Sequence, residues 1–247
     1  MAEKLSEDLP CPVSFYSTKD DNAAFVAKNI CHKPDGVQFE CIGKDRIGRV
    51  RLHIPGQFSV YNGMAAAAAA VTLGIDFDIV IKALCEAVGV KGRAEIVPTG
   101  RNFTVVIDYA HTPDGLENIC QTMKECCAGR LITVFGGGGD RDRTKRPKMG
   151  AVAARLSDVA VVTSDNPRSE EPAAIIREIV DGMRGSKAQI KVIENRIDAI
   201  HWAIKNAEEG DTVLLAGKGH ETYQILSTGV IHLDEREVVA EVLQQLP

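Results

Sequence analysis

The feature that most constrains the fold is a regular alternation of apolar and amphipathic segments from residue 102 to the C-terminus. Runs of apolar residues typical of buried strands occupy 103–107, 131–135, 159–163, 190–193 and 213–216. Between them, apolar residues recur at helical spacing over 115–126, 146–155, 172–183 and 197–207. Strands that are apolar throughout and separated by helices are typical of a parallel sheet covered on both faces. The sequence therefore predicts a self-contained α/β domain here.

The preceding residues follow a less regular pattern. Short β-rich segments at 13–16, 37–42 and 50–54 are bounded by turn residues, and helical patterns follow at 60–73 and 78–88. The apolar run within the first of these helices is mostly alanine and too short to span a bilayer, so it predicts a helix packed closely against a neighbour. No complete sheet can be recognised, and residues 1–95 are expected to be part of a domain.

The composition excludes several classes of protein. A net charge of −5 argues against a nucleic-acid-binding protein, and no segment is long and apolar enough to predict a membrane partner. The seven cysteines contain no C-x-x-C pair, and nothing resembles a signal peptide. Reduced thiols in a cytoplasmic protein are the simplest interpretation. No cysteine–histidine spacing indicates zinc.

Polar, turn-forming clusters follow four of the five predicted strands. Because the carboxyl ends of parallel strands meet at one edge of a sheet, these clusters are expected to lie together, where ligands of such sheets bind. Taken singly, each cluster has the composition of an ordinary turn. Together they carry long charged side chains where turns need small ones, which predicts a site for a small charged ligand. The clusters occupy residues 108–114, 136–143, 164–168 and 217–221.

The glycine run that follows the second strand does not fit a dinucleotide fingerprint. In a G-x-G-x-x-G pattern starting at Gly136 the third glycine position is Arg141, and in one starting at Gly137 it is Asp142. A phosphate-binding G-x-x-x-x-G-K-[ST] loop is absent from the whole sequence. The sequence therefore argues against an α/β oxidoreductase and against a nucleotide-hydrolysing domain acting alone.

Four motifs in order resemble the Mur ligase family, and within it the branch that adds diaminopimelate. They are DYAHTPDGL from Asp108, GGDRD from Gly138, DNPR from Asp165 and GKGHE from Gly217. The resemblance runs from about residue 10 to the end. It implies that residues 96–247 form the Rossmann-like C-terminal domain, preceded in residues 1–95 by part of the central ATPase domain. The UDP-binding domain, the P-loop and the carbamylated lysine that binds magnesium are expected upstream.

The resemblance also implies an activity. Members of this branch are cytoplasmic, ATP-dependent ligases that add meso-diaminopimelate to UDP-N-acetylmuramoyl-L-alanyl-D-glutamate during synthesis of peptidoglycan precursors. ATP phosphorylates the dipeptide carboxylate, and an amine then attacks the acyl phosphate. ATP and Mg²⁺ are expected to be bound mainly by the upstream region, so the chain by itself is expected to lack ligase and ATPase activity. The alternatives are an inactive amino-acid-binding fragment and a lysine-adding member of the family.

For the incoming amino acid, Arg168 is the main candidate. A guanidinium can hold a carboxylate through two charge-assisted hydrogen bonds, and meso-diaminopimelate differs from lysine by a second carboxylate. Lysine-adding relatives usually lack this arginine. Lys218 is a further possible site residue; for Lys218 and His220 alike, the alternative is a role in shaping their loop. The full set that the resemblance assigns to the amino acid is Arg141, Asp165, Asn166, Pro167, Arg168, Gly217 and Glu221.

For the nucleotide, the resemblance assigns Asn62 to adenine, Arg93 to the phosphates and Asp108 to the ribose. His111 is a secondary candidate beside them. Ser59 departs from the family, which often has asparagine at that position, and this puts one nucleotide contact in doubt because serine reaches less far. No catalytic residue and no metal ligand is assigned within this chain.

Overall fold

The computed structural model describes residues 10–33 and 35–246. The chain divides into two compact units, Met1–Val88 and Gly89–Pro247. From the sequence, the division was expected after residue 95. Residues 89–95 belong to the second unit because they lead directly into β5 (Glu95–Val97), which pairs with β6 (Thr104–Asp108). Each unit is described by itself.

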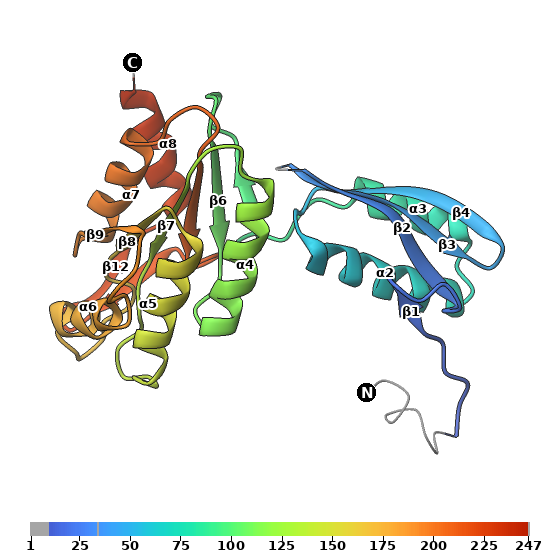
Figure 1. The fold of residues 1–247 in the computed structure, drawn as a ribbon, viewed down its shortest axis with the longest axis horizontal. Helices are drawn as coiled ribbons and strands as arrows, with labels where there is room; N and C mark the ends of the chain where they lie inside the picture. Colours follow the sequence, from blue (N-terminus) through green and yellow to red (C-terminus); the bar gives the residue numbers. More distant parts are fainter. Residues whose placement is uncertain (1–9, 34, 247) are drawn as a thin grey trace. The chain divides into compact units, whose positions relative to one another are not determined.

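The first unit is a four-stranded sheet with two helices on one face. The strands β1 (Tyr16–Ser17), β2 (Phe25–Lys33), β3 (Gly36–Gly43) and β4 (Arg46–Leu52) lie in that order (Figure 1). β1 is parallel to β2, and the other pairs are antiparallel. Alternate strand residues pack against α2 (Gln57–Thr72) and α3 (Phe77–Glu86). The alanine-rich segment lies within α2 and buries Met64 and Ala67 against the sheet, as predicted from the sequence.

The expectation that this block lacks a complete sheet was wrong, because β2 was not recognised. Its pairing with β3 shifts register between Lys28 and Cys31, and Asn29 has a φ of 51°. Such a bulge inserts a residue and breaks the period-two alternation from which strands are recognised. Residues after the bulge are mostly exposed, so the apolar pattern ends although the strand continues.

The second unit contains a six-stranded sheet in the order β5-β6-β10-β7-β8-β9. All neighbouring pairs are parallel except β5 with β6. The predicted α/β fold with a mostly parallel sheet is therefore confirmed, whereas β5, the hairpin β11–β12 and α8 were not predicted. The remaining elements are α4 (Pro113–Cys126), β7 (Leu131–Phe135), α5 (Lys145–Leu156), β8 (Val159–Val162), α6 (Pro172–Asp181), β9 (Gln189–Val192), α7 (Arg196–Lys205), β10 (Thr212–Ala216), β11 (Tyr223–Leu226), β12 (Gly229–His232) and α8 (Glu235–Gln245).

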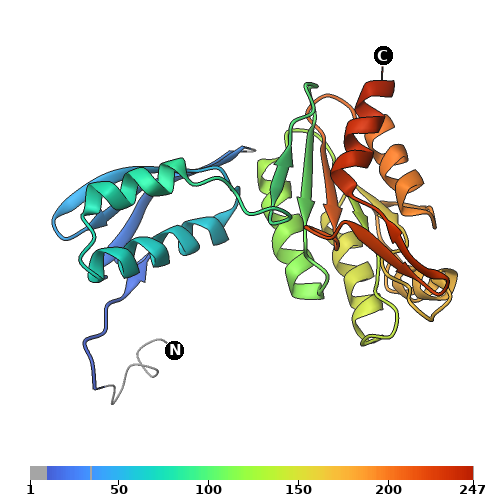
Figure 2. The ribbon, with the colours of Figure 1, turned by 180° about the vertical axis from the view of Figure 1, so that it is seen from behind.

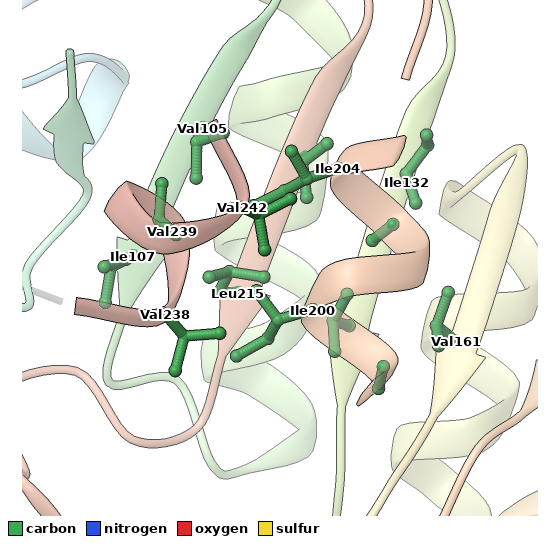
Figure 3. Packing of buried hydrophobic residues seen from close by; sticks show 14 of the residues in the cluster. Val105, Ile107, Ile132, Val161, Ile200, Ile204, Leu215, Val238, Val239 and Val242 are labelled. Carbon is green, nitrogen blue, oxygen red and sulfur yellow. The ribbon is translucent and has the colours of Figure 1, made fainter. Parts of the chain in front are cut away.

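Helices cover both faces of this sheet. α4, α5 and α6 pack side by side on one face, and α7 and α8 pack together on the other (Figure 2). Under α7 and α8, apolar residues of three adjacent strands form one buried cluster with residues of the two helices (Figure 3). The cluster includes Ile107, Leu215 and Ile132 of the strands and Ile200 and Val239 of the helices. Every residue of β7, β8 and β10 is buried, which explains why these strands are apolar at each position rather than at alternate ones.

The strand order determines which loops meet. β10 comes last among the six strands in the chain but lies between β6 and β7, and its final residue Ala216 pairs with Asp108. The backbone amide of Gly217 donates to the carbonyl of Asp108 at 2.9 Å. The polar clusters that follow β6, β10, β7 and β8 are therefore neighbours at the carboxyl edge of the sheet.

Candidate functional site

A cavity of about 370 Å³ opens at the carboxyl edge of the sheet in the second unit. All four of the predicted polar clusters contribute to it. Of the residues predicted to bind the amino acid, six line the cavity and Pro167 does not, and His111 also lines it. Arg93, Asp108 and Lys218 lie outside the lining. The lining residues are Tyr109, His111, Gly136, Gly137, Gly138, Arg141, Asp142, Lys145, Arg146, Met149, Asp165, Asn166, Arg168, Gly217 and Glu221.

The glycine run after β7 is required by close packing against the loop that follows β8. A Cβ on Gly136 would lie 2.4 Å from the carbonyl oxygen of Thr163, and one on Gly139 would lie 1.8 Å from that of Pro167. The amide of Gly139 also donates to the carbonyl of Asn166 at 2.9 Å. These glycines therefore bring two loops of the cavity into contact, which is why they do not follow a dinucleotide fingerprint.

Arg146 lies beneath this loop and was not recognised from the sequence. Its side chain is 2% exposed, and Nη2 donates to the carbonyl of Gly138 at 3.0 Å. Glu170 and Glu178 accept from the guanidinium at 2.7–2.9 Å. The hydrogen bonds from Arg146 lower the pKa of Glu170 to about 2. The glycine loop is thus held from below by a buried arginine paired with two partly exposed glutamates. The only sequence signal was its place on the helix face that also buries Met149 and Gly150.

Arg168 is held at one end of its guanidinium. Nη1 donates to the carbonyl of Gly139 at 2.9 Å and to that of Asn166 at 3.2 Å. Nε and Nη2 make no hydrogen bond to the residues that the structure describes. The backbone of Arg168 has a φ of 56°, in the left-handed region. The half-buried side chain therefore presents its Nε–Nη2 edge in a fixed orientation, and that edge suits a carboxylate.

Acidic groups face the cavity from the adjacent loops. Glu221 accepts at Oε2 from Asn166 Nδ2 and from Lys218 Nζ, both at 3.0 Å. Burial favours the neutral acid, but the hydrogen bonds from Asn166 and Lys218 outweigh it and lower the pKa of Glu221. Asp165 lies beside them, and a Cβ on Gly217, whose φ is 118°, would approach Asp165 Oδ2 to 2.7 Å. The cavity thus combines a guanidinium edge suited to a carboxylate with two acidic side chains.

The unpredicted hairpin β11–β12 supports the loop that carries Arg168. The backbone amide of Ile225 donates to Asn166 Oδ1 at 2.9 Å, and its carbonyl accepts from the amide of Arg168 at 3.1 Å. Gln224 Nε2 donates to the carbonyl of Asp165 at 2.5 Å. The turn-forming residues Ser227–Thr228–Gly229 between two short β-rich runs were the available sequence signal for this hairpin.

The residues predicted to contact a nucleotide occupy different places. The guanidinium of Arg93 lies 4.9 Å from the ring centroid of Tyr109, and His111 Nδ1 lies 2.8 Å from the Tyr109 carbonyl. The carboxylate of Asp108 accepts from the amides of Ala94 and Ala110, each at 2.7 Å. Burial is the largest influence on Asp108 and raises its pKa, against those hydrogen bonds.

Asn62 belongs to the first unit, where it is exposed on α2. Ser59, which departs from the family pattern, is buried and donates to the carbonyl of Pro55 at 3.0 Å. Its hydroxyl therefore stabilises the start of its own helix. Within residues 10–33 and 35–246, no three histidine, cysteine or acidic side chains are grouped to hold a metal ion. No helix of the described residues has the length and apolar character needed to cross a membrane.

Two family models match the chain. The model for the Mur ligase middle domain matches residues 1–70, and the model for the Mur ligase glutamate ligase domain matches residues 92–219. The chain belongs to the Mur ligase family. The resemblance inferred from the four motifs is thereby confirmed.

The similar proteins are diaminopimelate ligases about twice as long as this chain. The UDP-N-acetylmuramoyl-L-alanyl-D-glutamate–2,6-diaminopimelate ligase of Caldanaerobacter subterraneus subsp. tengcongensis is 51% identical over 91% of this chain and 46% of its own length. That of Syntrophomonas wolfei is 46% identical over 98% and 50%. A solved structure of an enzyme with the same name is 32% identical, covers 94% of this chain and 47% of its own, and has a TM-score of 0.71. The chain spans about half the length of the curated relatives it matches.

Proposed function

We propose that this chain supplies the amino-acid-binding part of an ATP-dependent ligase that adds meso-diaminopimelate to UDP-N-acetylmuramoyl-L-alanyl-D-glutamate. The observation that carries the proposal is the cavity at the carboxyl edge, where the Nε–Nη2 edge of Arg168 lies in the same pocket as the acids Asp165 and Glu221. The similar proteins named diaminopimelate ligase support it.

The proposed substrate matches the charges of the cavity. Meso-diaminopimelate carries a carboxylate and an amino group at each end. Arg168 and Arg141 provide cationic groups for a carboxylate, and Glu221 and Asp165 provide acceptors for an ammonium group. Lysine has no second carboxylate and would leave a half-buried arginine without its partner, which costs about 1–3 kcal/mol or more for a charged group. The cavity therefore favours diaminopimelate over lysine.

The rest of the proposed reaction needs ATP and Mg²⁺, and this chain supplies only some of the residues that would bind them. ATP, with Mg²⁺, supplies the phosphoryl group that activates the dipeptide carboxylate for attack by the amine. Arg93, whose exposed guanidinium lies over the ring of Tyr109, suits a phosphate. Asp108 suits a ribose hydroxyl because two backbone amides fix the orientation of its carboxylate, which can accept a further hydrogen bond. Asn62 is proposed to contact adenine. The described residues offer no cluster of acidic, histidine or cysteine side chains for Mg²⁺. The precursor pathway would place the protein in the cytoplasm.

Calorimetry of the 247-residue chain with meso-diaminopimelate and with L-lysine tests the amino-acid assignment. We expect diaminopimelate to bind at least tenfold more tightly. Glu221→Gln, which preserves shape and removes one charge, should weaken binding of both amino acids by a similar factor, because both carry the ammonium group. Equal affinity for the two amino acids in the unmodified chain would instead favour a lysine-adding member.

An activity assay separates a complete ligase from an amino-acid-binding part. The chain is incubated with ATP, Mg²⁺, the UDP-dipeptide and meso-diaminopimelate, and release of ADP is measured. Since its sequence has no P-loop, we expect no ADP above background. Turnover by the chain alone would contradict this division of roles.

A further inference from the structure

Lys218 has no place in the function proposed so far. Its side chain is completely buried behind the wall of the cavity, and Nζ lies 3.0 Å from Glu221 Oε2, 3.2 Å from Asn166 Oδ1 and 3.8 Å from Asp165 Oδ1. The ring of Tyr223 covers the ammonium group at 5.7 Å. A lysine that only shaped its loop would extend its ammonium group to solvent, as lysines ordinarily do.

The net charge of Lys218 and the two acids explains this arrangement. Asp165 and Glu221 each contribute a negative charge, and Lys218 contributes one positive charge between them, so the three groups together carry a single negative charge. Without the ammonium group, two partly buried carboxylates would repel one another, and one would take up a proton. The remaining negative charge matches one ammonium group of a ligand.

We propose that Lys218 is the internal counter-ion of the cavity, a positioning residue that keeps both acids ionised and sets the acid side to accept one ammonium group. The inference rests on the proposed function, because it concerns how the same cavity recognises a diamino acid. A substrate with two amino groups is then held by one of them as a cation. The other ammonium group meets no second unbalanced negative charge that would stabilise its cationic form. It can therefore release its proton to water and become the neutral amine that attack requires.

The surroundings of Glu221 support this assignment. Lys218 and His220 of its own loop favour its ionised form. Asn166, from the loop after β8, donates to it at 3.0 Å, whereas Asp165 of that loop is a second negative charge. Tyr109 and Tyr223 face the same region as uncharged groups. Among the described residues, Lys218 is the cation that contacts both acids, so its removal should have the largest effect on their titration.

The decisive experiment follows the carboxyl carbon of Glu221 by ¹³C NMR during a pH titration, with Glu221→Gln used to assign the signal. In the unmodified chain we expect the midpoint to lie below the ordinary range for glutamate. Lys218→Met, which preserves length but not charge, should raise the midpoint by at least one pH unit. Lys124→Met, which removes an exposed ion pair with Asp158, is the matched control and should leave it unchanged. An unchanged midpoint in Lys218→Met would overturn the inference.

A second variant covers the case in which Lys218→Met does not fold. Asp165→Asn removes one buried charge without leaving another unpaired, so it should fold. It brings the net charge of the three groups to zero. We expect the Glu221 midpoint to fall further and the affinity for meso-diaminopimelate to drop at least tenfold. A midpoint and an affinity equal to those of the unmodified chain would overturn the inference.

The two arms of the experiment distinguish the inference from the function on which it rests. The titration needs no ligand, so it decides the role of Lys218 whatever the cavity binds. If the unmodified chain binds no diaminopimelate at any pH while the Lys218→Met titration shifts as expected, the proposed substrate is wrong and the counter-ion assignment stands.

Discussion

Both edges of the six-stranded sheet carry charged side chains but use them differently. At the amino edge, Asp211 is buried and accepts from the backbone amides of Arg130 and Glu208 at 2.7 and 2.9 Å. The guanidinium of Arg130 donates to both oxygens of Asp211 and to the carbonyl of Asn206. These charges are paired with one another and with the backbone.

The carboxyl edge contrasts with this arrangement. Arg168 uses only Nη1, and Arg141 donates only to the carbonyl of its neighbour Asp140 among the described residues. The edges also differ in backbone strain. In the described part of the second unit, the non-glycine residues with positive φ are Ala94, Asp140 and Arg168, and each belongs to a loop of the carboxyl edge. The carboxyl edge also contains closed ion pairs, such as that of Lys218 with Glu221, but it differs in having arginines on the cavity lining with unused donors. One of them, Arg168, lies on strained backbone.

The largest expected effect is on the amino edge. Asp211→Ala leaves several backbone amides and a guanidinium without their acceptor, and should lower the free energy of unfolding by about 3 kcal/mol. The affinity for meso-diaminopimelate at 25 °C should change less than twofold. Urea denaturation and calorimetry on the same samples measure both. A loss of affinity matching the loss of stability would show that the two edges are not separable.

The converse experiment removes a charged side chain at the carboxyl edge, where affinity and not stability should change. Arg168→Ala should weaken diaminopimelate binding about a hundredfold, equivalent to about 2.7 kcal/mol, with a change in unfolding free energy below about 1 kcal/mol. Arg168→Lys should restore little, because an ammonium group cannot present two parallel donors. Arg155→Ala, which removes an exposed ion pair with Glu117, is the control and should alter neither quantity. Unchanged preference over lysine in Arg168→Ala would disprove the role of Arg168.

Acid should destabilise the cluster beneath the glycine loop. Because folding lowers the pKa of Glu170 to about 2, its contribution is fully present above the unfolded pKa near 4.5. It is lost as the pH falls from about 4.5 to about 2. With allowance for solvent screening, Glu170→Gln should cost on the order of 1–2 kcal/mol at pH 7 and flatten the pH dependence in that window. Thermal unfolding of both proteins at several pH values would show this, and parallel curves would exclude it.

The smallest expected effect concerns the strained backbone of Arg168. Its φ of 56° is costly for any residue with a Cβ, so Arg168→Gly should be more stable than Arg168→Ala by about 0.5–1 kcal/mol. Arg143 lacks a positive φ, and there the order should reverse, with Arg143→Gly less stable than Arg143→Ala. Paired urea denaturation curves decide the question, and the same order at both positions would argue against strain.

The contrast between the edges also explains what could be predicted from the sequence. Strands such as β7 and β10 were recognisable because burial on both faces makes them apolar at every position. The site loops were recognisable because charged residues follow those strands at the edge where ligands bind. β2 escaped recognition because its bulge interrupts the alternation, and β5 because it is a short edge strand of three half-buried residues.

Within the site, the buried charges could not be predicted. Arg146 and Lys218 have the residue types of an exposed surface, and only contacts with distant acids reveal them as buried. Glu170 lies 24 residues from Arg146 along the chain, and Asn166 lies 52 residues from Lys218. Neither pairing follows from local periodicity. Several of the charged residues that line the cavity were thus accessible from the sequence, whereas the residues that hold them in place were not.

The position of β10 has a consequence for how the site assembles over time. Its partners β6 and β7 begin 108 and 81 residues before it, and they do not pair with each other. During synthesis, these two strands emerge long before the strand that joins them. The sheet therefore cannot close until residues 212–216 have been made, and long-range pairing of this kind is slow. Glu221 and Lys218 follow β10 directly, so the acid side of the cavity is among the last parts of the domain to form.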